Sequence, residues 1–143
     1  MNVLVVGGSG FVGRHVVGAL RSRGDTVAVT GRDEARLRQV FPSGVRCVGW
    51  DPLSGPLPAS ALDGVDGVVN LAGEPVLGWW TARKRAGIRG SRVAGTRNLV
   101  EGIAGSPRKP RVLVNASAIG YYGDAAHRAL HETSPPATDF LGE

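Results

Sequence analysis

The sequence has one cysteine and no long hydrophobic run. The single cysteine, Cys47, excludes an internal disulfide, and the chain has no Cys/His cluster with the spacing of a metal site. The apolar residues 1–6 follow no basic segment and end at Gly7 and Gly8. We therefore expect neither a signal peptide nor a membrane span, and predict a cytoplasmic protein that binds no membrane and no metal.

What the sequence does contain is enough apolar material for a core and an excess of glycine. With 143 residues, of which 42% are hydrophobic and 20% charged, it fits one folded domain rather than a disordered chain. Its 22 glycines are about 15% of the chain, against a usual share of roughly 7%. They follow no Gly-X-Y period, which excludes collagen and indicates repeated tight turns or close backbone approaches.

Short apolar runs alternate with longer helical patterns along the chain, which is the order of βαβ units. The predicted helices span 11–23, with Phe11, Val12, His15, Val16, Ala19 and Leu20 on the apolar side, then 33–40 with Asp33 as N-cap, and 81–104. The predicted strands span residues 2–6, 26–30, 45–50, 65–71 and 111–116, and residues 51–60 form a loop.

These elements predict an α/β fold, a Rossmann-like doubly wound parallel sheet with strand order 3-2-1-4-5. The pattern weakens after the fifth strand: residues 120–139 are interpreted as a long loop, and the last few residues as the opening of another helix. An uncovered fifth strand at the sheet edge would be a liability. We therefore predict that residues 1–143 are an incomplete nucleotide-binding domain, truncated after that strand.

A glycine-rich turn joins the first predicted strand to the first helix. Gly7, Gly10 and Gly13 have the spacing G-x-x-G-x-x-G. Bare backbone N–H groups and the positive end of a helix can approach a pyrophosphate there, and any Cβ would obstruct that approach. The motif predicts a dinucleotide site formed by Gly7, Ser9, Gly10, Phe11, Val12 and Gly13.

The end of the second predicted strand bears on the choice of cofactor. NAD-binding proteins usually carry a carboxylate there, whereas this chain has Gly31 and Arg32, with Asp33 following. A guanidinium can pair with a 2′-phosphate, provided that Asp33 is turned away as a helix cap. The sequence thus favours NADP over NAD; the alternative is that Arg32 is an ordinary solvated arginine.

Five segments together resemble the extended short-chain dehydrogenase/reductase superfamily, specifically its NAD(P)-dependent epimerase/dehydratases and their atypical NADP-binding subgroup. The resemblance covers the whole chain, as an N-terminal half. It implies that the family's further strands and its small substrate-binding region are absent from these 143 residues. It rests on the glycine-rich turn at 7–13, Trp50-Asp51-Pro52, Asn70-Leu71-Ala72-Gly73-Glu74-Pro75, Ser91-Arg92-Val93-Ala94-Gly95-Thr96, and Ala116-Ser117-Ala118-Ile119-Gly120-Tyr121-Tyr122-Gly123.

The resemblance implies roles for individual residues. Asp51 would lie near the adenine amino group, and Leu71, Ala72 and Gly73 would pass beside the adenine ribose and phosphates. Arg92 would contact cofactor phosphate or ribose, with a solvated helix arginine as the alternative. Ser117 matches the active-site Ser/Thr, whose hydroxyl would bind a substrate oxygen.

The chain departs from the family at its acid/base motif, Tyr-x-x-x-Lys, in which the lysine lowers the pKa of the tyrosine. Neither Tyr121 nor Tyr122 has a lysine four residues on, and Phe140 stands near the expected tyrosine position. Tyr121 or Tyr122 is then the best candidate proton donor, with His127 and His131 as weaker ones.

The helix predicted at 81–104 is strongly basic, with Arg83, Lys84, Arg85, Arg89, Arg92 and Arg97 and no acid between them. We interpret this stripe as a solvated helix face, because no nucleic-acid motif accompanies it, and expect no nucleic acid as partner. The next option, implied by the resemblance, is a homodimer contact through this helix. Trp79 and Trp80 are predicted to be a packing anchor at its start.

Two functions remain open from the sequence. One is an NADP-dependent oxidoreductase of the epimerase/dehydratase type, acting on a small hydroxyl- or carbonyl-bearing, sugar-like substrate. The missing Tyr-x-x-x-Lys favours the other, a non-catalytic NADP(H)-binding sensor or partner-docking module.

Overall fold

The computed structural model describes residues 1–142. Its strands are β1 (Asn2–Val6), β2 (Thr26–Gly31), β3 (Val45–Gly49), β4 (Gly67–Asn70) and β5 (Val112–Asn115). Its α-helices are α1 (Phe11–Ser22), α2 (Glu34–Val40) and α3 (Ala82–Gly105), and two short 3₁₀ helices span Ala59–Leu62 and Ile119–Tyr122.

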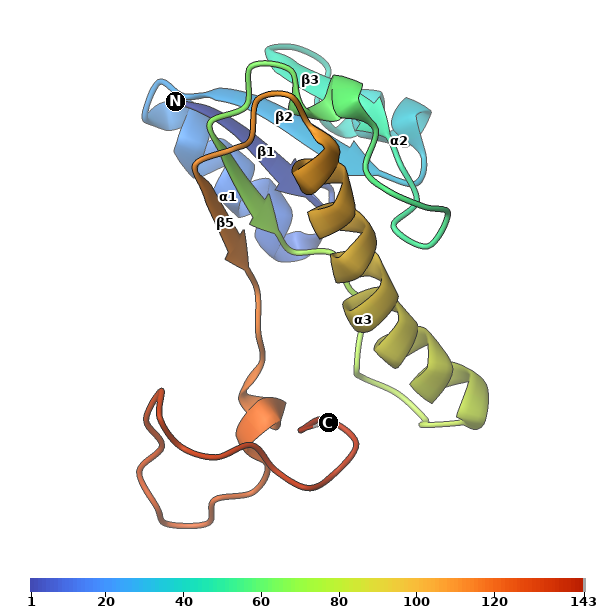
Figure 1. Cartoon of the computed structure of the whole chain (residues 1–143), viewed down its shortest axis with the longest axis vertical. Helices are drawn as coiled ribbons and strands as arrows, with labels where there is room; N and C mark the ends of the chain where they lie inside the picture. The colour runs from blue at the N-terminus through green and yellow to red at the C-terminus, as the bar shows by residue number, and fades with distance from the viewer. Residues whose placement is uncertain (143) are drawn as a thin grey trace.

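The five strands form one parallel sheet in the order β3-β2-β1-β4-β5, which confirms the predicted topology. Figure 1 shows α3 crossing one face of this sheet, with α1 and α2 on the other. Because side chains alternate along a strand, β1 supplies both layers. Val3 and Val5 pack in the layer that contains Val17 of α1, whereas Leu4 packs with Leu99 of α3.

The α1 helix forms where predicted, but its buried face differs from the predicted one. Gly13 and Val17 are buried, whereas Phe11 and Val12 are 76% and 56% exposed. Val16 and Leu20 of the predicted side are half-buried and pack against the core, so the prediction is confirmed for these two. The buried face is rotated toward Gly13, because a glycine with no side chain makes the closest approach to the strand–helix turn.

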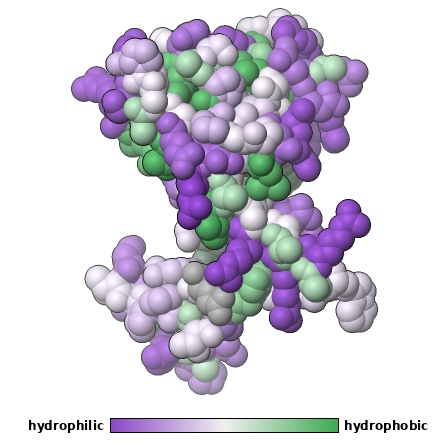
Figure 2. Space-filling view, turned by 45° about the vertical axis from the view of Figure 1, so that its right-hand side comes forward, coloured by the Kyte–Doolittle hydropathy of each residue, from purple (hydrophilic) through white to green (hydrophobic). Residues whose placement is uncertain are grey.

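The end of the chain is arranged differently from the core. All four residues of β5 are exposed, so this strand is an uncovered edge as predicted. Beyond it the chain leads away from the sheet (Figure 1), and a narrow waist separates this part from the main body (Figure 2). Residues 140–142 form a turn, so the helix expected at the end is not observed within the described residues.

The prediction that Trp79 and Trp80 anchor the start of α3 is confirmed for Trp80 only. Trp80 stacks edge-on against Phe140 with ring centroids 5.5 Å apart, and its Nε1 donates to Val76 O at 2.7 Å. Trp79 instead is 93% exposed and anchors nothing within residues 1–142. Phe140, which stands near the family's tyrosine position, also lies beneath the guanidinium of Arg85.

Asp66 connects three segments that enter the sheet. Its Oδ2 accepts a hydrogen bond from Asn2 N at 2.9 Å, its Oδ1 accepts one from Arg108 Nη2 at 2.8 Å, and its main-chain O accepts one from Arg111 N. The Asn2 N–H bond, followed by the charge of Arg108, holds the pKa of Asp66 below its ordinary value.

A lowered carboxyl pKa gives a stability contribution that is present at neutral pH and is lost as pH falls through the folded-state pKa. We therefore expect Asp66→Asn to be less stable than the parent at pH 7, with the difference in free energy of unfolding shrinking in the acid range. Urea denaturation across pH measures this. Asp63→Asn is the control, because the Asp63 carboxylate makes no hydrogen bond or ion pair within residues 1–142. Equal curves for Asp66→Asn and Asp63→Asn would contradict the assignment.

Candidate functional site

A cleft of about 350 Å³ lies at the carboxyl ends of β1, β2, β3 and β4. Main-chain bonds hold these ends together: Gly7 N donates to Thr30 O, Leu71 N to Val6 O, and Trp50 N to Gly31 O. Ligands of doubly wound folds bind at this edge, where the strand order reverses. The cleft is therefore the candidate site.

The glycine-rich turn forms one wall of the cleft. Gly7 has φ +77°, and an added Cβ would lie 3.0 Å from Ala72 N, so only glycine fits between the two loops. Gly10 is the N-cap of α1, and within residues 1–142 no side chain caps this helix. By contrast, Asp33 caps α2 and Thr81 caps α3. The first N–H groups of α1 therefore have no side-chain acceptor, and an anion can take that place.

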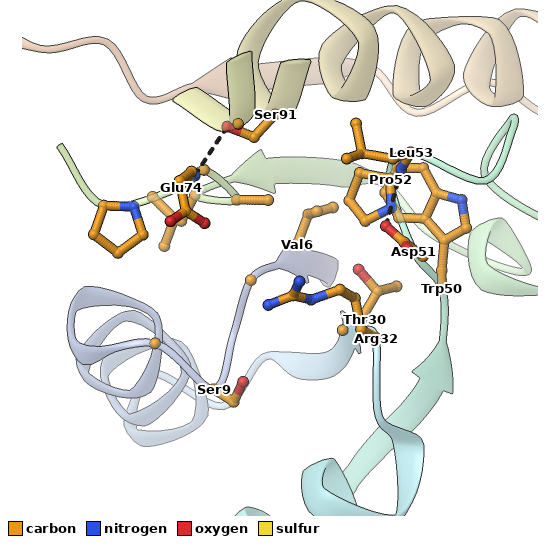
Figure 3. A pocket seen from close by; sticks show the side chains of 18 residues that line it. Val6, Ser9, Thr30, Arg32, Trp50, Asp51, Pro52, Leu53, Glu74 and Ser91 are labelled. Carbon is orange, nitrogen blue, oxygen red and sulfur yellow. Dashed lines mark hydrogen bonds between the residues drawn. The ribbon is translucent and has the colours of Figure 1, made fainter. Parts of the chain in front are cut away.

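Arg32 and Asp33 point in different directions. The guanidinium of Arg32 reaches into the cleft (Figure 3), where Arg32 is a lining residue. The Asp33 carboxylate accepts a hydrogen bond from Arg36 N at 2.9 Å, which confirms Asp33 as the cap of α2. The Asp33 carboxylate is thus turned away as a helix cap, as a contact between Arg32 and a 2′-phosphate requires.

Thr30 is the last buried residue of β2 and supplies an unpaired polar atom. Its side chain is fully buried, it lines the cleft, and its Oγ1 has no hydrogen-bond partner within residues 1–142. A buried hydroxyl without a partner costs about 1–3 kcal/mol. A ligand with polar groups in the cleft would remove that cost.

Glu74 carries the main negative charge of the opposite wall. Its carboxylate accepts a hydrogen bond from Lys84 Nζ at 2.7 Å, and this bond is the main reason why the pKa of Glu74 lies below its ordinary value; the charges of Lys84, Arg32 and Arg92 add to it. Its main-chain N donates to Ser91 Oγ of α3 (Figure 3). Two residues of α3 therefore hold the loop after β4: Ser91 bonds to the main chain of Glu74, and Lys84 bonds to its carboxylate.

The structure brings nine of the thirteen predicted cofactor residues together in the cleft lining: Gly7, Ser9, Gly10, Gly31, Arg32, Asp51, Leu71, Ala72 and Gly73. Asp51 has one carboxylate oxygen engaged with Leu53 N at 3.0 Å.

The other four lie outside the lining. Phe11 and Val12 are exposed on the first turn of α1, and Gly13 is buried against the turn. The Arg92 guanidinium lies beside Gly73 of the lining, and its Nη1 donates to Glu74 O at 3.1 Å and to Ile88 O at 3.3 Å.

The three predicted catalytic residues are not cleft residues. Ser117 and Tyr121 are exposed, Tyr122 is half-buried, and the two tyrosine rings pack against each other with centroids 5.0 Å apart. All three lie beyond β5, on the part of the chain that leads away from the sheet (Figure 1).

The prediction missed nine lining residues. Thr30 adjoins Gly31, and several others stood inside the motifs quoted above, so strand ends and motif neighbours carried a usable signal. The nine are Val6, Thr30, Trp50, Pro52, Leu53, Glu74, Pro75, Gly87 and Ser91.

Comparison with known proteins is consistent with this geometry. The model of the NAD dependent epimerase/dehydratase family matches residues 3–140. The chain belongs to this family. Within residues 1–142 no group of three or more His, Cys, Asp and Glu side chains is placed to hold a metal ion. None of the helices in those residues is long and apolar enough to cross a bilayer.

Relatives within the epimerase family include two curated proteins. The chain is 34% identical over 149 residues to the chloroplastic epimerase family protein SDR39U1 homolog of Arabidopsis thaliana, covering all of this chain and 42% of that protein. It is 34% identical over 143 residues to epimerase family protein YfhF of Bacillus subtilis, covering 99% of this chain and 46% of that protein. The chain thus spans less than half the length of either relative.

Solved structures of the epimerase family show the same fold. The human epimerase family protein SDR39U1 (isoform 2), crystallised with NADPH, superposes with a TM-score of 0.79 at 30% identity, over 99% of this chain and 45% of that one. UDP-glucuronic acid 4-epimerase from Bacillus cereus, solved with UDP-glucuronic acid and NAD, gives a TM-score of 0.78 at 24% identity, over 96% and 46%.

Proposed function

We propose that this chain binds NADP(H) in the cleft and is the cofactor-binding part of an oxidoreductase of the epimerase/dehydratase type. The observation that carries the proposal is the pairing of an uncapped α1 N-terminus with Arg32 on the same cleft. One suits a pyrophosphate and the other a 2′-phosphate. The NADPH that accompanies the human relative supports the same choice, although the Bacillus cereus structure holds NAD.

Residues of the chain fit the parts of such a cofactor. The turn from Gly7 to Gly10 would hold the pyrophosphate. The Thr30 hydroxyl and Arg32 would bind the adenosine ribose with its 2′-phosphate, and Asp51 would lie beside the adenine. When bound, the nicotinamide supplies hydride transfer to or from a carbon that bears a hydroxyl or carbonyl group. Ser117, with Tyr121 or Tyr122 as proton donor, is proposed to act on that oxygen.

A non-catalytic NADP(H)-binding sensor or docking module is the second candidate. It is favoured by the position of Ser117, Tyr121 and Tyr122, none of which lines the cleft within the described residues. Hydride exchange on hydroxyl- or carbonyl-bearing substrates, lost in Ser117→Ala, would support the enzyme. Binding of NADPH with no exchange on any substrate would support the module.

The NADP assignment is tested at Arg32. We expect Arg32→Gln to weaken NADPH binding by about 10–150-fold, because a hydrogen bond to a charged group contributes about 1.5–3 kcal/mol. NADH has no 2′-phosphate, so its affinity should change less than about twofold. Titration of both nucleotides, followed by nicotinamide fluorescence, measures this.

Arg36→Gln is the matched control, since Arg36 is an exposed arginine on α2 that does not line the cleft. It should leave both affinities unchanged. Equal losses of NADPH and NADH affinity in Arg32→Gln would refute the 2′-phosphate role.

A further inference from the structure

A second cavity, of about 440 Å³, adjoins the cofactor cleft. Its lining comes from the loop after β4 and the first turns of α3: Glu74, Trp79, Thr81, Arg83, Lys84 and Gly87. Glu74 and Gly87 line both cavities, so the two spaces meet at these residues. Neither the sequence motifs nor the family match assigns it a ligand.

The charge of this second cavity is positive. Lys84 and Glu74 form an ion pair at 2.7 Å, so their charges largely cancel. Arg83 remains, exposed and with no ion-pair partner within residues 1–142. Its planar guanidinium can bind two oxygens of a carboxylate or phosphate at once. The cavity therefore suits an oxyanion.

Trp79 gives the cavity an apolar face. Its indole is 93% exposed, and Leu77 beside it is 86% exposed. Indole is a large apolar surface with one N–H donor, and it gains most from contact with a flat or ring-shaped group. A ligand that joins a ring to an oxyanion would use both Trp79 and Arg83.

The junction allows such a ligand to reach the cofactor. Gly87 has no side chain, and an added Cβ there would stand 3.6 Å from Glu74 Cγ. Because Glu74 and Gly87 line both spaces, a molecule anchored at Arg83 lies next to the cofactor cleft.

We propose that the second cavity is the substrate-anchoring site, and that the substrate carries a carboxylate or phosphate joined to a ring. This rests on the proposed function, since the anchored molecule would present its hydroxyl or carbonyl carbon to the cofactor. Arg83 binds the oxyanion, Trp79 contacts the ring, and the Lys84–Glu74 ion pair holds Glu74 in place where the two cavities meet.

The experiment uses the full chain and three small probes: phenyl phosphate, benzoate and the neutral benzyl alcohol. The Trp79 indole N–H resonance, assigned with Trp79→Phe, reports occupancy, and each titration is run with and without saturating NADPH. We expect phenyl phosphate or benzoate, or both, to shift this resonance with millimolar affinity, and benzyl alcohol not to. Which anion binds more tightly distinguishes a phosphate from a carboxylate substrate.

Arg83→Gln should weaken anion binding at least about tenfold, which corresponds to about 1.4 kcal/mol. Arg97→Gln, at an exposed position further along α3 that lines neither cavity, should leave it unchanged. Equal shifts with benzyl alcohol, no shift with either anion, or full binding in Arg83→Gln would overturn the proposal. NADPH binding in the same samples tests the proposed function separately, so that either can fail alone.

Discussion

Gly10→Val should abolish most NADPH binding while the fold stays intact. Gly10 lines the cleft with φ −67° and ψ 171°, an extended conformation that any residue can adopt. An added Cβ would lie 3.3 Å from Gly7 O and near no other atom within 4 Å in residues 1–142, so the turn must shift by a few tenths of an ångström. The rest of the side chain would obstruct the first N–H groups of α1, where the pyrophosphate is proposed to bind. We expect the affinity to fall at least about 100-fold, since the motif works through close backbone approach.

Titration calorimetry measures the affinity of Gly10→Val, and circular dichroism and thermal unfolding check its fold. Gly18→Val is the matched control on the same helix, because an added Cβ at Gly18 meets nothing within 4 Å. It should bind NADPH as the parent does. Retained binding in a folded Gly10→Val protein would place the pyrophosphate elsewhere.

Gly13→Ala should destabilise the fold itself. An added Cβ would lie 2.7 Å from Gly8 O and 2.8 Å from Gly8 C, which are backbone atoms of the turn and cannot rotate away. Overpacking of this kind costs about 1–3 kcal/mol. Gly18→Ala is the same change on the same helix with open space around it, and it should stabilise by up to about 1 kcal/mol through helix propensity.

The helix-propensity gain is common to both changes, so we expect Gly13→Ala to be less stable than Gly18→Ala by the overpacking cost, about 1–3 kcal/mol in free energy of unfolding. Urea denaturation of both variants measures it. If Gly13→Ala were as stable as Gly18→Ala, the close packing of α1 on the turn would be contradicted.

The sheet and its edge could be predicted because their signals are local. Apolar runs such as Val3–Val6 alternate with helical segments, and right-handed crossovers leave few strand orders open. Gly7, Arg32 and Asp51 each stand after the end of a predicted strand, and a parallel sheet brings such residues to one edge. This holds even where the predicted end of a strand is off.

The remaining features depend on side-chain direction and long-range contact, which a sequence pattern does not contain. Arg92 stands where the resemblance implies a contact with the cofactor. The sequence did not indicate that its guanidinium would bond to the main chain of Glu74 and Ile88. Trp79 and Trp80 are adjacent, but only Trp80 meets Phe140, sixty residues further on. Ser117 follows β5, and its place depends on how the chain continues beyond that strand.

Backbone amide shifts on addition of NADPH test the central claim most directly. If the bare amides at the start of α1 hold the two linked phosphates, the largest changes in a ¹⁵N spectrum will fall on residues 8–13, with further changes at Thr30 and Arg32. No change on adding NADPH, or changes confined to α3 and the segment after β5, would contradict the account.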